Sequence, residues 1–170
     1  MLKKVNKRKS LRINGYDYSQ PGKYFVTICT QNRLEILSQI YTEKRGTNNE
    51  EVLIKLYKFG KIVKEEIDHI NNKYNNINIE KYVIMPNHIH LIIEIKEKTI
   101  ITLNHLIMQF KSITTNRYIK EIKNKFEKKI WQRNYYEHII RNEKEYLEIY
   151  EYIENNPLKW KEDIYNSKKI

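Results

Sequence analysis

A buried strand that carries two histidines is encoded by Pro86-Asn87-His88-Ile89-His90-Leu91-Ile92-Ile93. The β-branched and aliphatic residues predict a strand from His88 to Ile95, preceded by a turn or bulge at Pro86-Asn87. Side chains two positions apart on a strand point to the same face, so His88 and His90 should converge. Such a pair can bind one divalent ion, or it can be two histidines held by hydrogen bonds at a strand end.

The segments before this strand alternate between strand and helix patterns. A strand is predicted at Lys23–Thr30 after the turn signal Pro21-Gly22, and residues 33–50 read as irregular. A helix is predicted from Glu51, because apolar residues then recur every three or four positions. Its stripe is Leu53, Leu56, Gly60, Val63, Ile67, Ile70 and Tyr74. Asn75-Asn76 should end it, and a second strand should run from Ile77 to Met85.

The segments after the histidine strand complete a recognisable order. Thr102 is the expected N-cap of a second helix, with the stripe Leu103, Leu106, Ile107, Phe110 and Ile113. A fourth strand is predicted at Lys129–Ile140. Asn142, with Glu145 in capping-box spacing, should start a last helix that Pro157 closes after Asn155. We therefore predict an α+β fold, a ferredoxin-like βαββαβ antiparallel sheet with helices on one face and an added C-terminal helix.

Composition favours one domain that binds a polyanion. The 170 residues suit one core, which we expect at 21–170, after a basic arm at 1–20. Charged residues make up 31%, and no apolar run is long enough for a membrane span or a signal peptide. A cytoplasmic protein without membrane partners is expected. Cys29 is the only cysteine, which excludes a disulfide framework and a multi-cysteine zinc site.

The net charge of +11 predicts attraction to nucleic acid. Fourteen tyrosines among the cations suit single-stranded nucleic acid, although an AT-rich genome would also raise the tyrosine content. Lys111, Arg117, Lys120 and Lys123 lie largely off the apolar stripe of the second helix, where they form either a nucleic-acid surface or an ordinary solvated face.

The last helix brings a phenol and an amide to one face, since Tyr152 and Asn156 are four residues apart. If this face packs over the histidine strand, the Asn156 oxygen can become a third metal ligand beside His88 and His90. A divalent ion there would stabilise charge on a scissile phosphate, and Tyr152 could attack the phosphorus. The alternatives are a tyrosine that only packs on the sheet and an asparagine that only ends the helix.

Five ordered motifs make the chain resemble the REP-associated tyrosine transposases, of the single-tyrosine HUH transposase superfamily. They are Tyr16–Thr30 (YDYSQPGKYFVTICT), the HUH block MPNHIHLII, Phe110-Lys111-Ser112, Trp131–Arg141 (WQRNYYEHIIR) and Tyr152–Pro157 (YIENNP). The match spans residues 8 to about 160. The tail after Pro157 is shorter than in many relatives.

The resemblance implies a transposase that cleaves and joins single-stranded DNA at hairpins through a 5′-phosphotyrosine. It makes Tyr152 the nucleophile, and His88, His90 and Asn156 the ligands of Mg²⁺ or Mn²⁺. Residues 21–170 would be the HUH catalytic domain, acting as a monomer or a homodimer. The rival functions are a non-catalytic hairpin-binding module and an HUH replication or conjugation nuclease.

Several further residues are candidates for DNA contacts, since arginine and lysine pair with phosphate. His138 is a possible auxiliary residue, or a strand histidine without a role, and Arg133 and Arg141 can instead be ordinary surface charges. The predicted DNA-binding residues are Lys7, Arg8, Lys9, Arg12, Lys111, Arg117, Lys120, Arg133 and Arg141.

Overall fold

A four-stranded antiparallel sheet forms the centre of the molecule. The computed structural model describes residues 20–45, 49–122 and 129–166. The sheet order is β4-β5-β1-β6, and each neighbouring pair is antiparallel. The strands are β1 (Gly22–Cys29), β4 (Ile77–Ile84), β5 (His88–Ile95) and β6 (Tyr136–Ile140). This is the strand order of a ferredoxin-like sheet, so the predicted fold class is confirmed.

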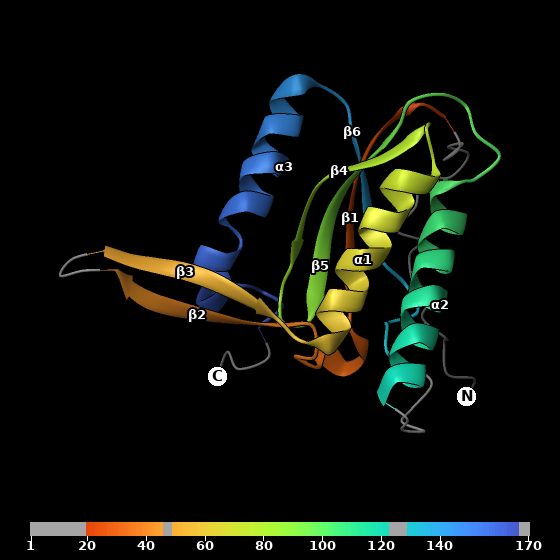
Figure 1. Cartoon of the computed structure of the whole chain (residues 1–170). Coiled ribbons are helices and arrows are strands. Elements are labelled where there is room, and N and C mark those ends of the chain that lie inside the picture. Colours follow the sequence, from red (N-terminus) through yellow and green to blue (C-terminus); the bar gives the residue numbers. More distant parts are fainter. Residues whose placement is uncertain (1–19, 46–48, 123–128, 167–170) are drawn as a thin grey trace, which may run out of the picture.

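Helices cover both faces of the sheet (Figure 1). On one face lie α1 (Lys58–Lys73) and α2 (Leu103–Ile122), which bury the larger apolar core. On the other face lies α3 (Glu143–Asn155), over a smaller apolar cluster that includes Ile92, Ile140 and Ile153. The prediction of two helices on one face and a further C-terminal helix therefore holds.

The start of α1 is held close to the chain that leaves β1. A Cβ atom built on Gly60 would lie 2.0 Å from the carbonyl oxygen of Leu37, so only glycine fits there. The backbone nitrogen of Tyr57 donates to the same carbonyl at 2.9 Å. Gly60 therefore allows the start of α1 to approach the backbone at Leu37 closely.

The segment between β1 and α1 differs from the prediction. A short 3-10 helix, η1 (Gln31–Arg33), leads into a hairpin of β2 (Ser38–Arg45) and β3 (Asn49–Leu56) that projects from the body (Figure 1). Ser38–Arg45 and the residues from Asn49 onward thus form strands, although residues 33–50 were predicted to be irregular, and α1 begins at Lys58 rather than at Glu51. Leu53 and Leu56 belong to β3, although their three-residue spacing mimics a helix.

Two expectations for the second half of the chain also need correction. The fourth strand covers only Tyr136–Ile140, and Trp131 contributes an isolated bridge to Thr30 instead. Trp131 turns inward, where its indole nitrogen donates to Thr114 Oγ1 at 3.0 Å. Thr114 is buried in α2, whereas Ile113, predicted to be on the apolar stripe, is 38% exposed.

The predicted helix caps are present. Thr102 Oγ1 accepts from the backbone nitrogen of His105, and Asn142 Oδ1 accepts from that of Glu145. Helix α3 ends at Asn155, and Pro157 opens the 3-10 helix η2 (Pro157–Glu162). Among the described residues, no helix has the length and apolar character of a membrane span.

Candidate active site

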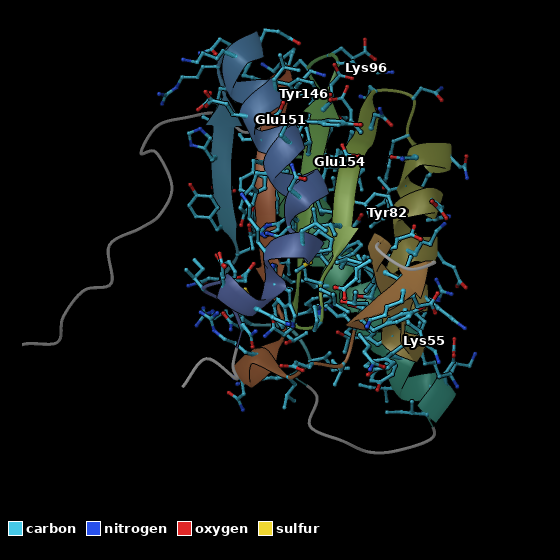
Figure 2. The ribbon with its side chains drawn as sticks, turned by 90° about the vertical axis from the view of Figure 1, so that its left-hand side faces the viewer. Lys55, Tyr82, Lys96, Tyr146, Glu151 and Glu154 are labelled. Atoms are coloured by element: carbon cyan, nitrogen blue, oxygen red, sulfur yellow. The ribbon has the colours of Figure 1, made fainter. Side chains whose placement is uncertain are left out.

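The register of the sheet gathers polar side chains on the face that α3 covers. His90 lies opposite Thr27, and Thr27 lies opposite Tyr136 on the far side of β1. Two residues before His90 in β5, His88 lies opposite Cys29. These residues alternate with the apolar residues that face α1 and α2. Figure 2 shows α3 lying across this face of the sheet, with Tyr146 and Glu154 labelled along its length.

The two histidines of the HUH motif converge as predicted. Their Nε2 atoms are 3.1 Å apart, and both side chains are almost fully buried. His88 Nδ1 lies 2.9 Å from Asn87 Oδ1, and His90 Nδ1 lies 2.8 Å from Thr27 Oγ1. Each ring is therefore held from its Nδ1 side, which directs both Nε2 atoms toward one point.

The hydrogen-bond network assigns the proton positions. Asn87 Nδ2 donates to the carbonyls of Tyr165 and Arg33, so its Oδ1 must accept from His88 Nδ1. His88 Nε2 is then an acceptor, and His90 Nε2 donates to it across the 3.1 Å contact. With the proton of His90 on Nε2, the Thr27 hydroxyl donates to His90 Nδ1. If that proton moves to Nδ1, the same hydroxyl accepts from it, because a hydroxyl can do both. The pair can thus present two unprotonated Nε2 atoms.

Burial keeps both imidazoles neutral. It lowers the pKa of His90 to about 3. Burial, with smaller contributions from His90 and Arg33, also lowers the pKa of His88 well below its usual value. Neutral imidazole is the form that binds metals. The site is therefore in the protonation state that a cation requires at neutral pH.

Tyr152 reaches the histidine pair from α3. Its hydroxyl oxygen is 3.3 Å from His90 Nε2, and the residue as a whole is 41% exposed. Phe25 packs edge-on against the Tyr152 ring and stacks on His90. Burial and the nearby charge of Asp163 raise the pKa of the Tyr152 phenol to about 12. The phenol is consequently neutral, accessible and fixed next to His90.

Asn156 supplies the strongest indication of an additional ligand. The residue is 2% exposed, and its Oδ1 atom is buried without a hydrogen-bond partner. A buried amide oxygen left without a partner is costly, unless something electropositive binds there. Two imidazole nitrogens and an amide oxygen are donor types that divalent cations accept. In the described residues no three histidine, cysteine or acidic side chains form a metal-binding group by themselves.

The segment after α3 closes one side of the site and was not predicted from the sequence. Asp163 Oδ2 lies 4.0 Å from His88 Nε2, and the Tyr165 ring packs 4.6 Å from the His88 ring. Trp160 also lies near His88. No local motif marks these residues, and only the path of the chain after Pro157 brings them here. Asn87 and Thr27 were likewise missed, although both adjoin predicted strands.

The predicted DNA-binding residues are scattered. Lys7, Arg8, Lys9 and Arg12 lie outside the described residues. Arg117 forms an ion pair with Glu65, and Lys120 is exposed in the last turn of α2, on the face of the sheet away from Tyr152. Arg133 and Arg141 are exposed on either side of β6.

Lys111 was predicted to lie on an exposed basic face of the second helix, and the structure corrects this prediction. Its Nζ atom donates to the carbonyl oxygens of Gln132, Arg133 and Asn134, and burial lowers its pKa to about 8. It ties α2 to the segment before β6. His138 Nε2 lies 2.6 Å from Glu145 Oε1, which links β6 to the start of α3.

The sequence matches one family profile and resembles two proteins of Haemophilus influenzae. The sequence profile of the family described as "Transposase IS200 like" matches residues 18–156. A Haemophilus influenzae protein without a characterised function is 35% identical over 94% of this chain and 93% of its own length. A second Haemophilus influenzae protein carries the provisional name REP-associated tyrosine transposase. It is 29% identical over 84% of this chain and 74% of its own length.

Solved structures show the same fold. A REP-associated tyrosine transposase bound to a REP hairpin superposes with a TM-score of 0.61 at 21% identity. That alignment covers 87% of this chain and 73% of the other. A protein from Deinococcus radiodurans R1, provisionally described as a transposase, superposes with a TM-score of 0.51 at 17% identity. It covers 85% of this chain and 95% of the other. The resemblance predicted from the five motifs is confirmed.

Proposed function

Because the chain belongs to the IS200-like transposase family, we propose that it cleaves and rejoins single-stranded DNA through a covalent bond to Tyr152. The observation that carries this proposal is the approach of Tyr152 on α3 to the histidine pair on β5. Tyr152 Oη lies 3.3 Å from His90 Nε2, and the unpartnered Oδ1 of Asn156 is buried one helical turn further along α3.

Mg²⁺ or Mn²⁺ is the proposed cofactor, and His88 Nε2, His90 Nε2 and Asn156 Oδ1 would hold it. When bound, a divalent ion supplies positive charge that stabilises a phosphate under attack and lowers the pKa of a nearby phenol. The chain does the rest of the preparation. Asn87 and Thr27 orient the imidazoles, and burial keeps them unprotonated.

Tyr152 is the proposed nucleophile. Its oxygen attacks the phosphorus, the bond to the 3′ oxygen breaks, and the 5′ phosphate becomes attached to the tyrosine. The phenol proton passes to water, and the departing 3′ oxygen takes up a proton from water. The phosphodiester energy is retained in the phosphotyrosine, so a 3′ hydroxyl can later reverse the step and join a strand. Phe25 holds the ring edge-on, which restricts the direction of attack.

A DNA hairpin is the proposed substrate, for two reasons. A structural neighbour, a REP-associated tyrosine transposase, was solved with a REP hairpin. The net charge of +11 also favours a polyanion. Arg133 and Arg141 are exposed just before and just after β6, and both are proposed to contact the DNA. The basic arm at 1–20 is proposed to add affinity that does not depend on sequence.

Capture of the covalent product tests this function. Protein incubated with a hairpin strand and Mn²⁺ should yield an adduct that persists on a denaturing gel. Tyr152→Phe removes one oxygen and keeps the ring, so it should bind the strand and form no adduct. Tyr146→Phe is the matched control, because Tyr146 lies on the same helix and its ring packs against Tyr150.

Two results would contradict the proposal in different ways. Normal adduct formation by Tyr152→Phe would mean that another residue is the nucleophile. Tight binding of the strand without any adduct from the unmodified protein would favour a hairpin-binding module. A replication or conjugation nuclease would also form the adduct, because it uses the same chemistry.

A further inference from the structure

We infer that the ring of Tyr136 is a stacking platform for a nucleobase next to the phosphate that Tyr152 attacks. The inference rests on the proposed function, because Tyr152 defines where that phosphate lies. Tyr136 is the first residue of β6, the edge strand beside β1. The contact would therefore join a base of the substrate to the edge of the sheet.

Tyr136 lies on the same face of the sheet as the histidine pair. It is opposite Thr27 of β1, whose hydroxyl contacts His90. The Tyr136 ring packs edge-on against Phe25, with centroids 6.1 Å apart, and Tyr152 packs edge-on against the same ring, also at 6.1 Å. The two tyrosine rings are therefore both neighbours of one phenyl ring. A nucleotide has to span only that ring to meet both tyrosines.

Helix α3 leaves this end of β6 uncovered, because the helix crosses the sheet obliquely (Figure 2). It begins at Glu143, just after β6 ends at Ile140. Its later residues Tyr150 and Glu154 contact Lys81 on β4, which is the opposite edge strand. The helix thus starts near the end of β6 that is distant from Tyr136 and moves away toward β4.

The exposure and charge around Tyr136 suit a single strand of DNA. Tyr136 is 42% exposed, although it adjoins a site whose histidines are almost fully buried. An aromatic ring can stack on any base, and cations beside it can pair with the phosphates. Arg133, three residues before Tyr136, is exposed and can supply such a cation. Ring and guanidinium together match the pattern of a single-strand contact.

The segment that leads into Tyr136 is held in place by α2. Lys111 Nζ donates to the carbonyl oxygens of residues 132, 133 and 134 and lies 5.2 Å from the centroid of the Tyr135 ring. The indole nitrogen of Trp131 donates to Thr114 Oγ1. Because the preceding backbone is anchored, Tyr136 is fixed before DNA arrives, and little ordering should be needed when a base binds.

Fluorescence of 2-aminopurine tests the inference, since stacking quenches this base. The probe is placed in turn at each nucleotide of the single-stranded flank of the hairpin strand. Tyr152→Phe protein is used for binding, so that the strand stays uncleaved. Quenching should be strongest at a nucleotide that adjoins the phosphate attached in the adduct of the unmodified protein. Adding Tyr136→Ala should abolish this quenching, and adding Tyr136→Phe should retain it, because the ring is kept.

Affinity for matched strands separates stacking from other effects. Tyr136→Ala should weaken binding of the intact strand about tenfold, and should leave binding of a strand that lacks this base within about twofold. Tyr136→Leu, which keeps apolar bulk without an aromatic face, should behave like Tyr136→Ala. Tyr57→Ala is the control, because Tyr57 is 40% exposed at the start of α1, and should leave both affinities within about twofold.

Three results would overturn the inference. Equal loss of affinity for the two strands in Tyr136→Ala would mean that the ring does not contact this base. Full affinity in Tyr136→Leu would mean apolar packing rather than stacking. In both cases adduct formation through Tyr152 would continue, so the proposed function would stand. Quenching by Tyr136 without any adduct from the unmodified protein would overturn the proposed function, and with it the placement of the base beside Tyr152.

Discussion

The two faces of the central sheet are built from the same strands, but only the face under α3 carries the buried histidines. Toward α1 and α2, strand β5 presents Ile89, Leu91 and Ile93, which are almost fully buried in the larger core. Toward α3, the same strand presents His88 and His90. A shift of one residue along the strand changes the face, so neighbouring positions serve different purposes.

One face of the sheet therefore contributes mainly to stability, and the other carries the groups proposed for catalysis. The α1 and α2 face excludes water over a continuous apolar cluster. The α3 face buries polar groups whose hydrogen bonds fix ring orientation and proton position. Substitutions on the first face should therefore act on unfolding, and those on the second should act on cleavage and metal binding. Measuring unfolding, cleavage and metal binding on variants of each face tests that separation.

His88→Ala should have the largest effect, and this effect should be on cleavage and metal binding rather than on hairpin binding. Loss of a proposed metal ligand should reduce adduct formation at least about 10³-fold, equivalent to more than about 4 kcal/mol in the barrier. Hairpin binding should persist, because the basic residues carry the affinity. Gel quantification and filter binding measure the two effects. Cleavage by this variant at the normal rate would remove His88 from the site.

Phe59→Ala should have the opposite profile. Phe59 is fully buried in α1, with ring centroids 4.7 Å from Tyr118 and 5.1 Å from Trp131. Its truncation should lower the free energy of unfolding by about 3–5 kcal/mol in urea titration. Cleavage well below the unfolding transition should stay near normal. Met108→Ala is the control, since Met108 is 63% exposed on α2. A large loss of cleavage in folded Phe59→Ala would show that the faces are coupled.

Thr27→Val should have an intermediate effect and should mark the polar face as a positioning network. Valine keeps the shape but removes the hydroxyl that contacts His90 Nδ1 at 2.8 Å. Affinity for Mn²⁺ should fall about 10–100-fold, as is usual when the partner of a ligating histidine is removed. Cleavage at saturating Mn²⁺ should recover partly. Full metal affinity in the variant would show that Thr27 does not orient the ring.

The pH dependence of stability should give the smallest change between neighbouring measurements. Burial lowers the pKa of His90 to about 3, below its ordinary 6.5, so the unfolded chain binds more protons between these values. Stability should therefore fall as the pH drops from about 6.5 toward 3, by at most about 1.4 kcal/mol per pH unit for this residue. Urea titration in chelator at pH 6, 5 and 4 should show a shallower slope for His90→Gln. An unchanged slope would indicate that His90 titrates normally.

The sequence was sufficient for the sheet and for the convergence of the key side chains. Alternation in β5 and the capping signals of α3 are local, so the convergence of His88 and His90 and the position of Tyr152 on the last helix could be predicted before any geometry was known. Asp163 could not be found in this way, because its position depends on how η2 folds back after Pro157.

The hairpin was missed for a related reason. Most side chains of β2 and β3 are polar, and Ile40 and Ile54 are the members that pack on the smaller cluster. Periodicity detects a strand by its contrast between faces, and that contrast is weak here. The leucines of β3 also happened to extend the stripe of the following helix. The prediction therefore assigned to α1 two residues that belong to a strand.

The reach of α3 over its own sheet has a consequence for kinetics. Tyr152 meets His90 of the same chain, so one polypeptide brings both groups together. Cleavage should then be first order in protein, with a rate per chain that is unchanged by dilution. Mixing Tyr152→Phe chains with His88→Ala chains should restore no cleavage at any ratio. Each active site needs the tyrosine and the histidines of the same chain, and neither variant has both. Complementation would mean that the tyrosine helix is exchanged between molecules.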